Sequence, residues 1–158
     1  MWGSSVKIVI VDDQTSARTM LRHILEDIGP ELEVFDFGDS EEALRWSEHN
    51  RPDLLLLDYR MPAIDGLEFA RRFRRSLTNR NVPIVLVTVV GDEPIRQAAL
   101  DAGVIDFLVK PVRPRELRSR CRNLLQMRRQ SEVIKDHARA LEQKLADGLQ
   151  EVEQRETE

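Results

Sequence analysis

Residues 54–57 are four consecutive leucines, and Asp58 follows them directly. A short apolar run bounded by turn-forming residues is typical of a strand that is covered on both of its faces. Strands of this kind belong to parallel sheets, which have helices packed against each side. The run therefore predicts a central strand of a parallel α/β domain. It also raises a chemical question, because an unpaired carboxylate at the end of a buried strand is costly.

The rest of the first 125 residues alternates between short apolar runs and segments of helical periodicity. Residues 14–28, for example, carry apolar side chains at the i, i+3, i+4 and i+7 positions of one helix face. The predicted strands are 7–11, 33–37, 54–57, 84–88 and 106–109, and the predicted helices are 14–28, 41–50 (capped by Asp39 or Ser40), 66–77, a segment capped by Asp92, and a segment that begins at Pro114. This alternation predicts a flavodoxin-like, doubly wound α/β fold with five parallel strands in the order 2-1-3-4-5.

Polar residues stand at the carboxyl ends of four of these strands. Asp12 and Asp13 follow the first strand, Asp58 follows the third, Thr88 ends the fourth, and Lys110 follows the fifth. One aspartate after a strand is usually only a turn residue or a helix cap. The carboxyl ends of parallel strands share one edge of the sheet, however, and ligands bind there, where the strand order reverses. We therefore expect the three carboxylates to converge within a few ångströms, flanked by Thr88 and Lys110.

Three carboxylates beside one lysine leave a negative charge that needs a further cation. Like charges at close range raise one or more of the carboxyl pKa values unless a cation compensates them. Hard oxygen ligands in a shallow site favour Mg²⁺, which keeps several of its water ligands. The pattern therefore predicts a bound Mg²⁺, for which Mn²⁺ should substitute.

Four motifs resemble, in their order and spacing, the CheY-like receiver domain of two-component response regulators. They are VDD at 11–13, LLLLDYRMPAIDG at 54–66, VLVT at 85–88 and FLVKP at 107–111, and the resemblance covers residues 6–125. It implies that Asp58 accepts a phosphoryl group from a histidine of a sensor kinase or phosphotransfer protein. It also implies that Asp13, Asp58 and the backbone carbonyl of Arg60 bind Mg²⁺ directly, with Asp12 joining through water.

The same resemblance implies roles for residues around the acceptor. Lys110 and Thr88 would contact phosphoryl oxygens, Thr88 and Phe107 would form the conformational switch, and the peptide bond before Pro111 would be cis. Val89 and Val90 depart from the family pattern, which usually has small or polar residues there, and we expect their bulk to slow the entry of water.

Residues 126–158 have a different character, because they contain no proline and no strand-like run and are densely charged. Apolar or small residues recur there at alternating spacings of three and four, which is the heptad pattern of a coiled coil. The seam consists of Leu124, Met127, Ser131, Ile134, Ala138, Leu141, Leu145, Gly148 and Val152. We expect an extended helix that is a coiled-coil connector or a dimerising tail, and it resembles connectors that lead to HD-GYP cyclic-di-GMP phosphodiesterase domains. The chain would then be either a fragment of such a protein or a complete single-domain regulator.

Composition narrows the class of protein further. A formal net charge of −4 argues against a nucleic-acid binder, and a single cysteine excludes an intramolecular disulfide. The N-terminal apolar run is too short for a signal-peptide core or a membrane span. We therefore expect a cytoplasmic protein without membrane insertion or direct nucleic-acid binding. We also expect a homodimer that pairs through its fourth helix, fifth strand and fifth helix, and through its C-terminal helix.

The interpretation favoured here is a signalling switch, which is not an enzyme apart from catalysing its own aspartyl phosphorylation and dephosphorylation. One alternative is a Mg²⁺-dependent phosphatase of the haloacid-dehalogenase kind, which also uses an aspartate at a strand end. Those enzymes carry a second acid two residues after the first, and Arg60 occupies that position in this chain. A second alternative is a receiver-like scaffold that dimerises without phosphorylation, which the complete set of acceptor, metal and lysine positions disfavours.

Overall fold

The computed structural model describes residues 5–89 and 93–157, and the chain divides into two compact units, Met1–Leu125 and Gln126–Glu158. The first unit alternates strands and helices as the sequence predicts. Its elements are β1 (Val6–Val11), α1 (Thr15–Glu26), β2 (Leu32–Phe37), α2 (Ser40–His49), β3 (Leu54–Asp58), α3 (Gly66–Arg75), the short 3₁₀ helix η1 (Leu77–Asn79), β4 (Ile84–Thr88), α4 (Glu93–Asp101), β5 (Asp106–Val109) and α5 (Pro114–Thr157), which continues into the second unit.

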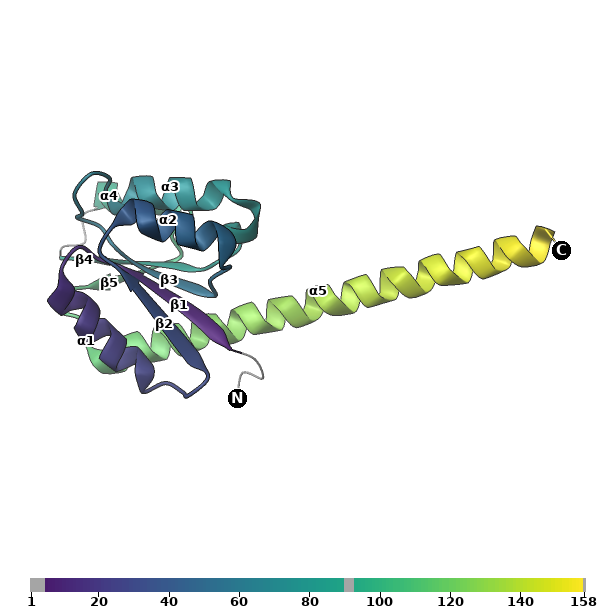
Figure 1. Cartoon of the computed structure of the whole chain (residues 1–158), viewed down its shortest axis with the longest axis horizontal. Coiled ribbons are helices and arrows are strands. Elements are labelled where there is room, and N and C mark those ends of the chain that lie inside the picture. The colour runs from purple at the N-terminus through teal and green to yellow at the C-terminus, as the bar shows by residue number, and fades with distance from the viewer. Residues whose placement is uncertain (1–4, 90–92, 158) are drawn as a thin grey trace. The chain divides into compact units, whose positions relative to one another are not determined.

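The five strands are parallel and lie in the order β2-β1-β3-β4-β5, which confirms the predicted doubly wound sheet. Helices α2, α3 and α4 cover one face, while α1 and the first part of α5 cover the other (Figure 1). Strand β1 pairs with β3 from Ile8 opposite Leu54 to Val11 opposite Leu57. The first residues beyond this pairing are therefore Asp12 and Asp58, which start out as neighbours at the carboxyl edge.

The leucine run that ends at Asp58 lies in the middle of the sheet and supplies both halves of the core. Leu54 and Leu56 face the α1 and α5 side, whereas Leu55 and Leu57 face the α2, α3 and α4 side, and all four are at most 1% exposed. Alternate side chains of a strand point to opposite faces, so a strand covered on both sides must be apolar throughout. This packing holds the strand that carries Asp58 rigidly between two layers of helices.

The helix boundaries follow local capping chemistry, with small differences from the sequence prediction. The Asp39 side chain caps α2 by accepting from the backbone N–H groups of Glu41 and Glu42. The third helix ends at Arg75 and not at residue 77 as predicted, because Ser76 is extended and Leu77 begins the 3₁₀ turn. The predicted cap of α4, Asp92, lies outside the described residues.

The second unit is a single helical segment, the part of α5 from Gln126 onward. Its large apolar side chains are exposed, with Met127 at 59%, Leu141 at 60% and Leu145 at 70%. In the part of the chain that the structure describes, every helix is too short or too polar to cross a lipid bilayer.

Candidate functional site

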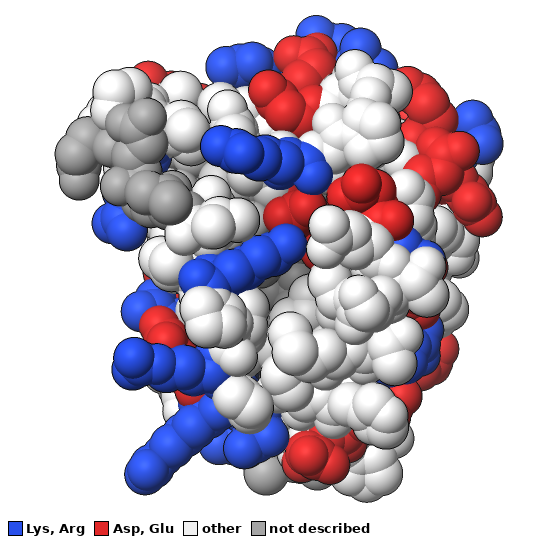
Figure 2. Space-filling model, turned by 90° about the vertical axis from the view of Figure 1, so that its left-hand side faces the viewer, with Lys and Arg blue, Asp and Glu red and all other residues white. Residues whose placement is uncertain are grey.

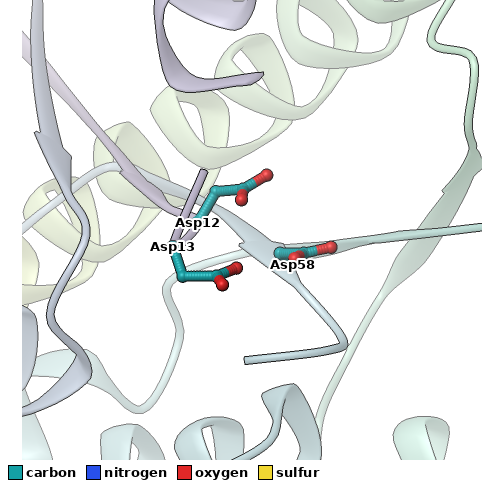
Figure 3. Close-up of side chains that lie close together, drawn as sticks. All are labelled: Asp12, Asp13 and Asp58. Carbon is teal, nitrogen blue, oxygen red and sulfur yellow. The ribbon is translucent and has the colours of Figure 1, made fainter. Parts of the chain in front are cut away.

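Three aspartates converge at the carboxyl edge of the sheet. Asp12 and Asp13 lie in the turn after β1, and Asp58 ends the adjacent strand β3, so that one carboxylate oxygen from each lies within 4.8 Å of the others. Figure 3 shows the three side chains next to one another at the ends of these strands. Asp12 and Asp58 are buried, and Asp13 is exposed. The cluster therefore opens to solvent on the side of Asp13.

Lys110, which follows β5, supplies the positive charge of the cluster. Its Nζ atom lies 3.1 Å from Oδ1 of Asp58 and 3.5 Å from Oδ2 of Asp12. The backbone N–H of Lys110 donates to the carbonyl oxygen of Thr88 at 2.8 Å, and the peptide bond between Lys110 and Pro111 is cis. Residues from the ends of β1, β3, β4 and β5 thus meet at one place.

The charges of the cluster shift the pKa values of its central pair. Burial raises the pKa of Asp58 above its ordinary value, and the charges of Asp12 and Asp13 add to this effect, while the hydrogen bond from Lys110 only partly opposes it. Burial by itself would lower the pKa of Lys110, but its hydrogen bond to Asp58 and the nearby carboxylates raise it. The raised pKa of Asp58 thus comes first from burial and then from the two neighbouring carboxylates, whereas the raised pKa of Lys110 comes from the carboxylates beside it.

One carboxylate oxygen in this cluster is incompletely neutralised by the protein. Oδ1 of Asp12 accepts from the backbone N–H of Gln14 at 2.9 Å, whereas Oδ2 is buried and accepts no hydrogen bond from any described residue. The nearest positive charge to this oxygen is Nζ of Lys110 at 3.5 Å, which is shared with Asp58, and a buried carboxylate that is only partly neutralised is costly. The donor set consists of carboxylate oxygens alone, which suits Mg²⁺. The residues present therefore fit a hard divalent ion.

Sequence reasoning missed the role of Gly66 in shaping the loop after Asp58. The backbone N–H of Gly66 donates to the carbonyl oxygen of Tyr59 at 2.8 Å. A Cβ atom at position 66 would lie 2.7 Å from the carbonyl oxygen of Asp58 and 3.0 Å from Cα of Tyr59. Only glycine allows this close approach. The loop that contains Arg60 is thereby held against the end of β3, and the glycine of the IDG sequence was the available signal.

The residues predicted to form the switch lie on β4, which pairs with the acceptor strand β3, and on β5, the next strand in the sheet. Thr88 is the last residue of β4 and is buried, and Phe107 is the second residue of β5 and is partly buried. The Arg96 guanidinium lies 5.4 Å from the centre of the Phe107 ring. The Val89 side chain is 56% exposed, so its bulk projects toward solvent near the site, and Val90 lies outside the described residues.

The face of the molecule that contains this edge of the sheet has acidic side chains near its centre, and others lie toward its margins (Figure 2). Figure 2 shows the central acids between two long basic side chains. A partly exposed group of three carboxylates with a lysine beside it could hold a divalent cation and a small, highly charged group. This arrangement suits phosphoryl transfer, in which catalysis consists mostly of positioning and charge neutralisation.

Residues 8–122 match the family of response regulator receiver domains. The chain is 66% identical, over 99% of its length, to the cyclic di-GMP phosphodiesterase response regulator RpfG of Xanthomonas campestris pv. campestris (strain 8004), of which the match covers 43%. It is 35% identical, over 80% of its length, to the alkaline phosphatase synthesis transcriptional regulatory protein PhoP of Bacillus subtilis (strain 168), of which the match covers 50%. The chain thus spans half or less of the length of these relatives.

Solved structures share the fold of the first unit. The chemotaxis protein CheY4 of Vibrio cholerae is 30% identical and superimposes with a TM-score of 0.72, over 77% of this chain and 99% of that one. The receiver domain of a sensor histidine kinase from Pseudomonas aeruginosa PAO1 is 29% identical with a TM-score of 0.67, over 80% of this chain and 98% of that one. The latter structure has a magnesium ion coordinated in its active site cleft.

Proposed function

Because the chain belongs to the response regulator receiver domain family, we propose that it accepts a phosphoryl group on Asp58 from a phosphohistidine of a sensor kinase or phosphotransfer protein. The observation that carries the proposal is the convergence of Asp12, Asp13 and Asp58, with Lys110 at 3.1 Å from the Asp58 carboxylate. This constellation supports acceptance of a phosphoryl group and does not suggest a free-standing hydrolase.

The transfer step follows from the chemistry of the acceptor. A carboxylate oxygen of Asp58 forms a bond to phosphorus, the bond from phosphorus to the histidine nitrogen breaks, and the electron pair stays on the imidazole. Lys110 already donates to Asp58 and can shift to a phosphoryl oxygen as the new bond forms. Thr88 can donate its hydroxyl to another phosphoryl oxygen.

We assign Mg²⁺ to the acidic cluster, with Asp13, Asp58 and the backbone carbonyl of Arg60 as its ligands and Asp12 joining through water. Mn²⁺ should occupy the same oxygens. The bound ion would neutralise negative charge on the phosphoryl oxygens. Two features support the assignment: the buried Oδ2 of Asp12, which accepts no hydrogen bond from any described residue, and the magnesium ion held by the Pseudomonas receiver domain.

We further propose that residues 6–125 are the phosphoacceptor domain and that residues 126–158 are a connector that couples it to its response. The α4-β5-α5 face carries the groups that could pair two copies. Asp106 of β5 pairs with Arg120 of α5, and two exposed apolar residues flank the strand: Ile105, which precedes Asp106, and Val109, which ends β5. Movement of Phe107 on phosphorylation would disturb this face and change how α5 is held.

For the output, we propose a cyclic-di-GMP phosphodiesterase module of the kind named for RpfG. The similarity to that protein runs through the helical second unit, because it covers 99% of this chain. The PhoP similarity covers only 80% of this chain. Sequencing the complete native gene would test this proposal, since an HD-GYP segment after residue 158 is expected and a DNA-binding segment there would contradict it.

The acceptor assignment is tested by phosphorylation with a small donor. Incubation with acetyl phosphate and Mg²⁺ should add one phosphoryl group to the chain, observed by intact mass, and Asp58→Asn should abolish the addition. Asp53→Asn serves as a matched control, because Asp53 precedes β3 and its side chain accepts from the backbone N–H of Lys7 at the opposite end of the strand. Equal labelling of the Asp58→Asn variant and the parent would overturn the assignment.

A further inference from the structure

Arg18 of α1 connects the aspartate pair to the edge strand β2. Its Nη1 atom donates to the backbone carbonyl oxygen of Asp12 at 2.6 Å, and its Nε atom donates to Oδ2 of Asp36 at 3.0 Å. A third, longer contact joins Nη2 to the Thr15 hydroxyl at 3.3 Å. The Arg18 side chain is only 15% exposed. A guanidinium with this many fixed partners can hold its acceptors in one geometry.

The acceptor on Asp12 belongs to the peptide group that joins Asp12 to Asp13. The backbone N–H of Asp12 is fixed separately, because it donates to the carbonyl oxygen of Phe37 at 3.1 Å. Arg18 fixes the other side of this turn by holding the carbonyl. The orientation of that peptide determines where the Asp13 side chain leaves the backbone. Since Asp13 is exposed, packing does little to orient it, and the turn must do so.

Two neighbouring residues keep Arg18 in place. Asp36 also accepts from Arg22, and this hydrogen bond and that of Arg18 outweigh burial, so that the pKa of Asp36 is lowered and its carboxylate stays charged. Gly38 leaves room for the guanidinium, because a Cβ atom at that position would lie 2.7 Å from Nη1 of Arg18. The three nearest atoms to this Cβ position all belong to the Arg18 side chain. An alanine at position 38 would therefore act chiefly by displacing Arg18.

We propose that Arg18 is a positioning residue for metal binding: by holding the Asp12 carbonyl against β2, it orients Asp13 toward Asp58 and thereby sets the Mg²⁺ affinity of the phosphoacceptor site. The inference rests on the proposed function, since it concerns the ion assigned to that site. Partners that orient metal ligands from outside the coordination sphere typically change affinity by about 10- to 100-fold when removed.

The test measures Mg²⁺ affinity by calorimetry on the full chain. Arg18→Ala should weaken binding by about tenfold, and Gly38→Ala should weaken it similarly although the arginine is still present. Arg18→Lys should recover part of the affinity, because a lysine can donate one of the lost hydrogen bonds. Arg22→Ala is the matched control, since Arg22 contacts Asp36 without contacting the Asp12 carbonyl, and it should stay within about twofold of the parent.

A second measurement separates positioning from loss of structure. The rate of labelling by acetyl phosphate at saturating Mg²⁺ should return close to the parental rate in Arg18→Ala, because no group that contacts the phosphoryl donor has been removed. Equal Mg²⁺ affinities for Arg18→Ala, Gly38→Ala and the parent would overturn the inference. If Arg18→Ala does not fold, Gly38→Ala and Arg18→Lys decide the outcome. A parent chain that binds no Mg²⁺ would instead overturn the proposed function, which distinguishes the two failures.

Discussion

At the scale of single residues, the charged form of the Asp58 carboxyl group is destabilised by its surroundings when no metal ion is bound. Asp58 ends an apolar strand and lies beside two further carboxylates, and among the described residues Lys110 is the one cation recorded as paired with it. A buried acid in such surroundings is destabilised in its charged form. This cost is typical of functional sites, and a bound cation would relieve the repulsion between these carboxylates and an anionic phosphoryl donor.

The raised pKa of Asp58 predicts how stability depends on pH when no metal ion is bound. Because burial and the neighbouring carboxylates raise it above 3.8, the folded state binds the Asp58 proton more tightly than the unfolded state does. The resulting stabilisation is complete below the unfolded pKa, near 4, and is lost as pH rises through the folded pKa. Asp58→Asn does not ionise, so its free energy of unfolding should exceed that of the parent increasingly as pH rises through this window.

Urea unfolding in the presence of a chelator would measure this difference at a series of pH values. Saturating Mg²⁺ should remove or reverse the gap at neutral pH, because the ion stabilises the parent carboxylate and binds more weakly to the variant. A gap that does not change with pH would contradict the assigned direction of the Asp58 shift.

At the scale of secondary-structure elements, α5 changes its environment along its length. In its first part, Leu117, Cys121 and Leu125 are buried in the core, and burial raises the pKa of the Cys121 thiol to about 12. Beyond Gln126 the apolar residues of the same helix are exposed, among them Ile134 at 68% and Val152 at 51%. An amphipathic helix gains most of its stability from packing its apolar face. The exposed seam therefore suits association with a second copy.

We predict that Leu141→Asp weakens self-association through the C-terminal helix. A charge in a buried seam layer costs a few kcal/mol, so sedimentation should show a dimer for the parent and a monomer for the variant. Ala140→Asp is the control, because it adds the same charge at a neighbouring exposed position off the seam and should leave the dimer intact. If the parent remains monomeric even with the beryllofluoride mimic of phosphorylation bound, the segment is a connector alone.

At the scale of the whole molecule, the two units have unequal roles in folding. The residues of both hydrophobic core clusters lie at or before Leu125. The family match, at residues 8–122, also falls within the first unit. The second unit contributes a helix without a core of its own. The first unit should therefore contain what is needed for folding and for the site. The second unit should serve for self-association, or for transmitting the response of the first unit to an output module.

A chain that ends at Leu125 should then fold and bind Mg²⁺ as the parent does. At protein concentrations where the parent is monomeric, its free energy of unfolding should stay close to the parental value, because the large apolar side chains that are removed are exposed. Its Mg²⁺ affinity should be unchanged, and only self-association should weaken. Denaturant unfolding and calorimetry on both chains would check this, and a shortened chain that fails to unfold cooperatively would contradict it.

Much of this architecture follows from local sequence pattern. The strand run at 54–57, the helical periodicity of 14–28 and the placement of acids after strands predict the parallel sheet and the convergence of Asp12, Asp13 and Asp58. These predictions match the structure because each depends only on which face of a helix or strand is buried. The spacing of apolar residues along the sequence already indicates that face. The exact end of α3 did not follow from the apolar spacing, because the backbone becomes extended at Ser76 and a 3₁₀ turn begins at Leu77.

The contacts that shape the site arise only when distant segments meet. No spacing indicates that Arg18 would reach both the Asp12 carbonyl and Asp36, or that Gly66 must be small because it lies against the carbonyl of Asp58. Nor could any pattern show that one oxygen of Asp12 is left buried without a hydrogen bond. These features depend on side-chain reach and backbone approach in three dimensions, and a linear pattern contains no information about either.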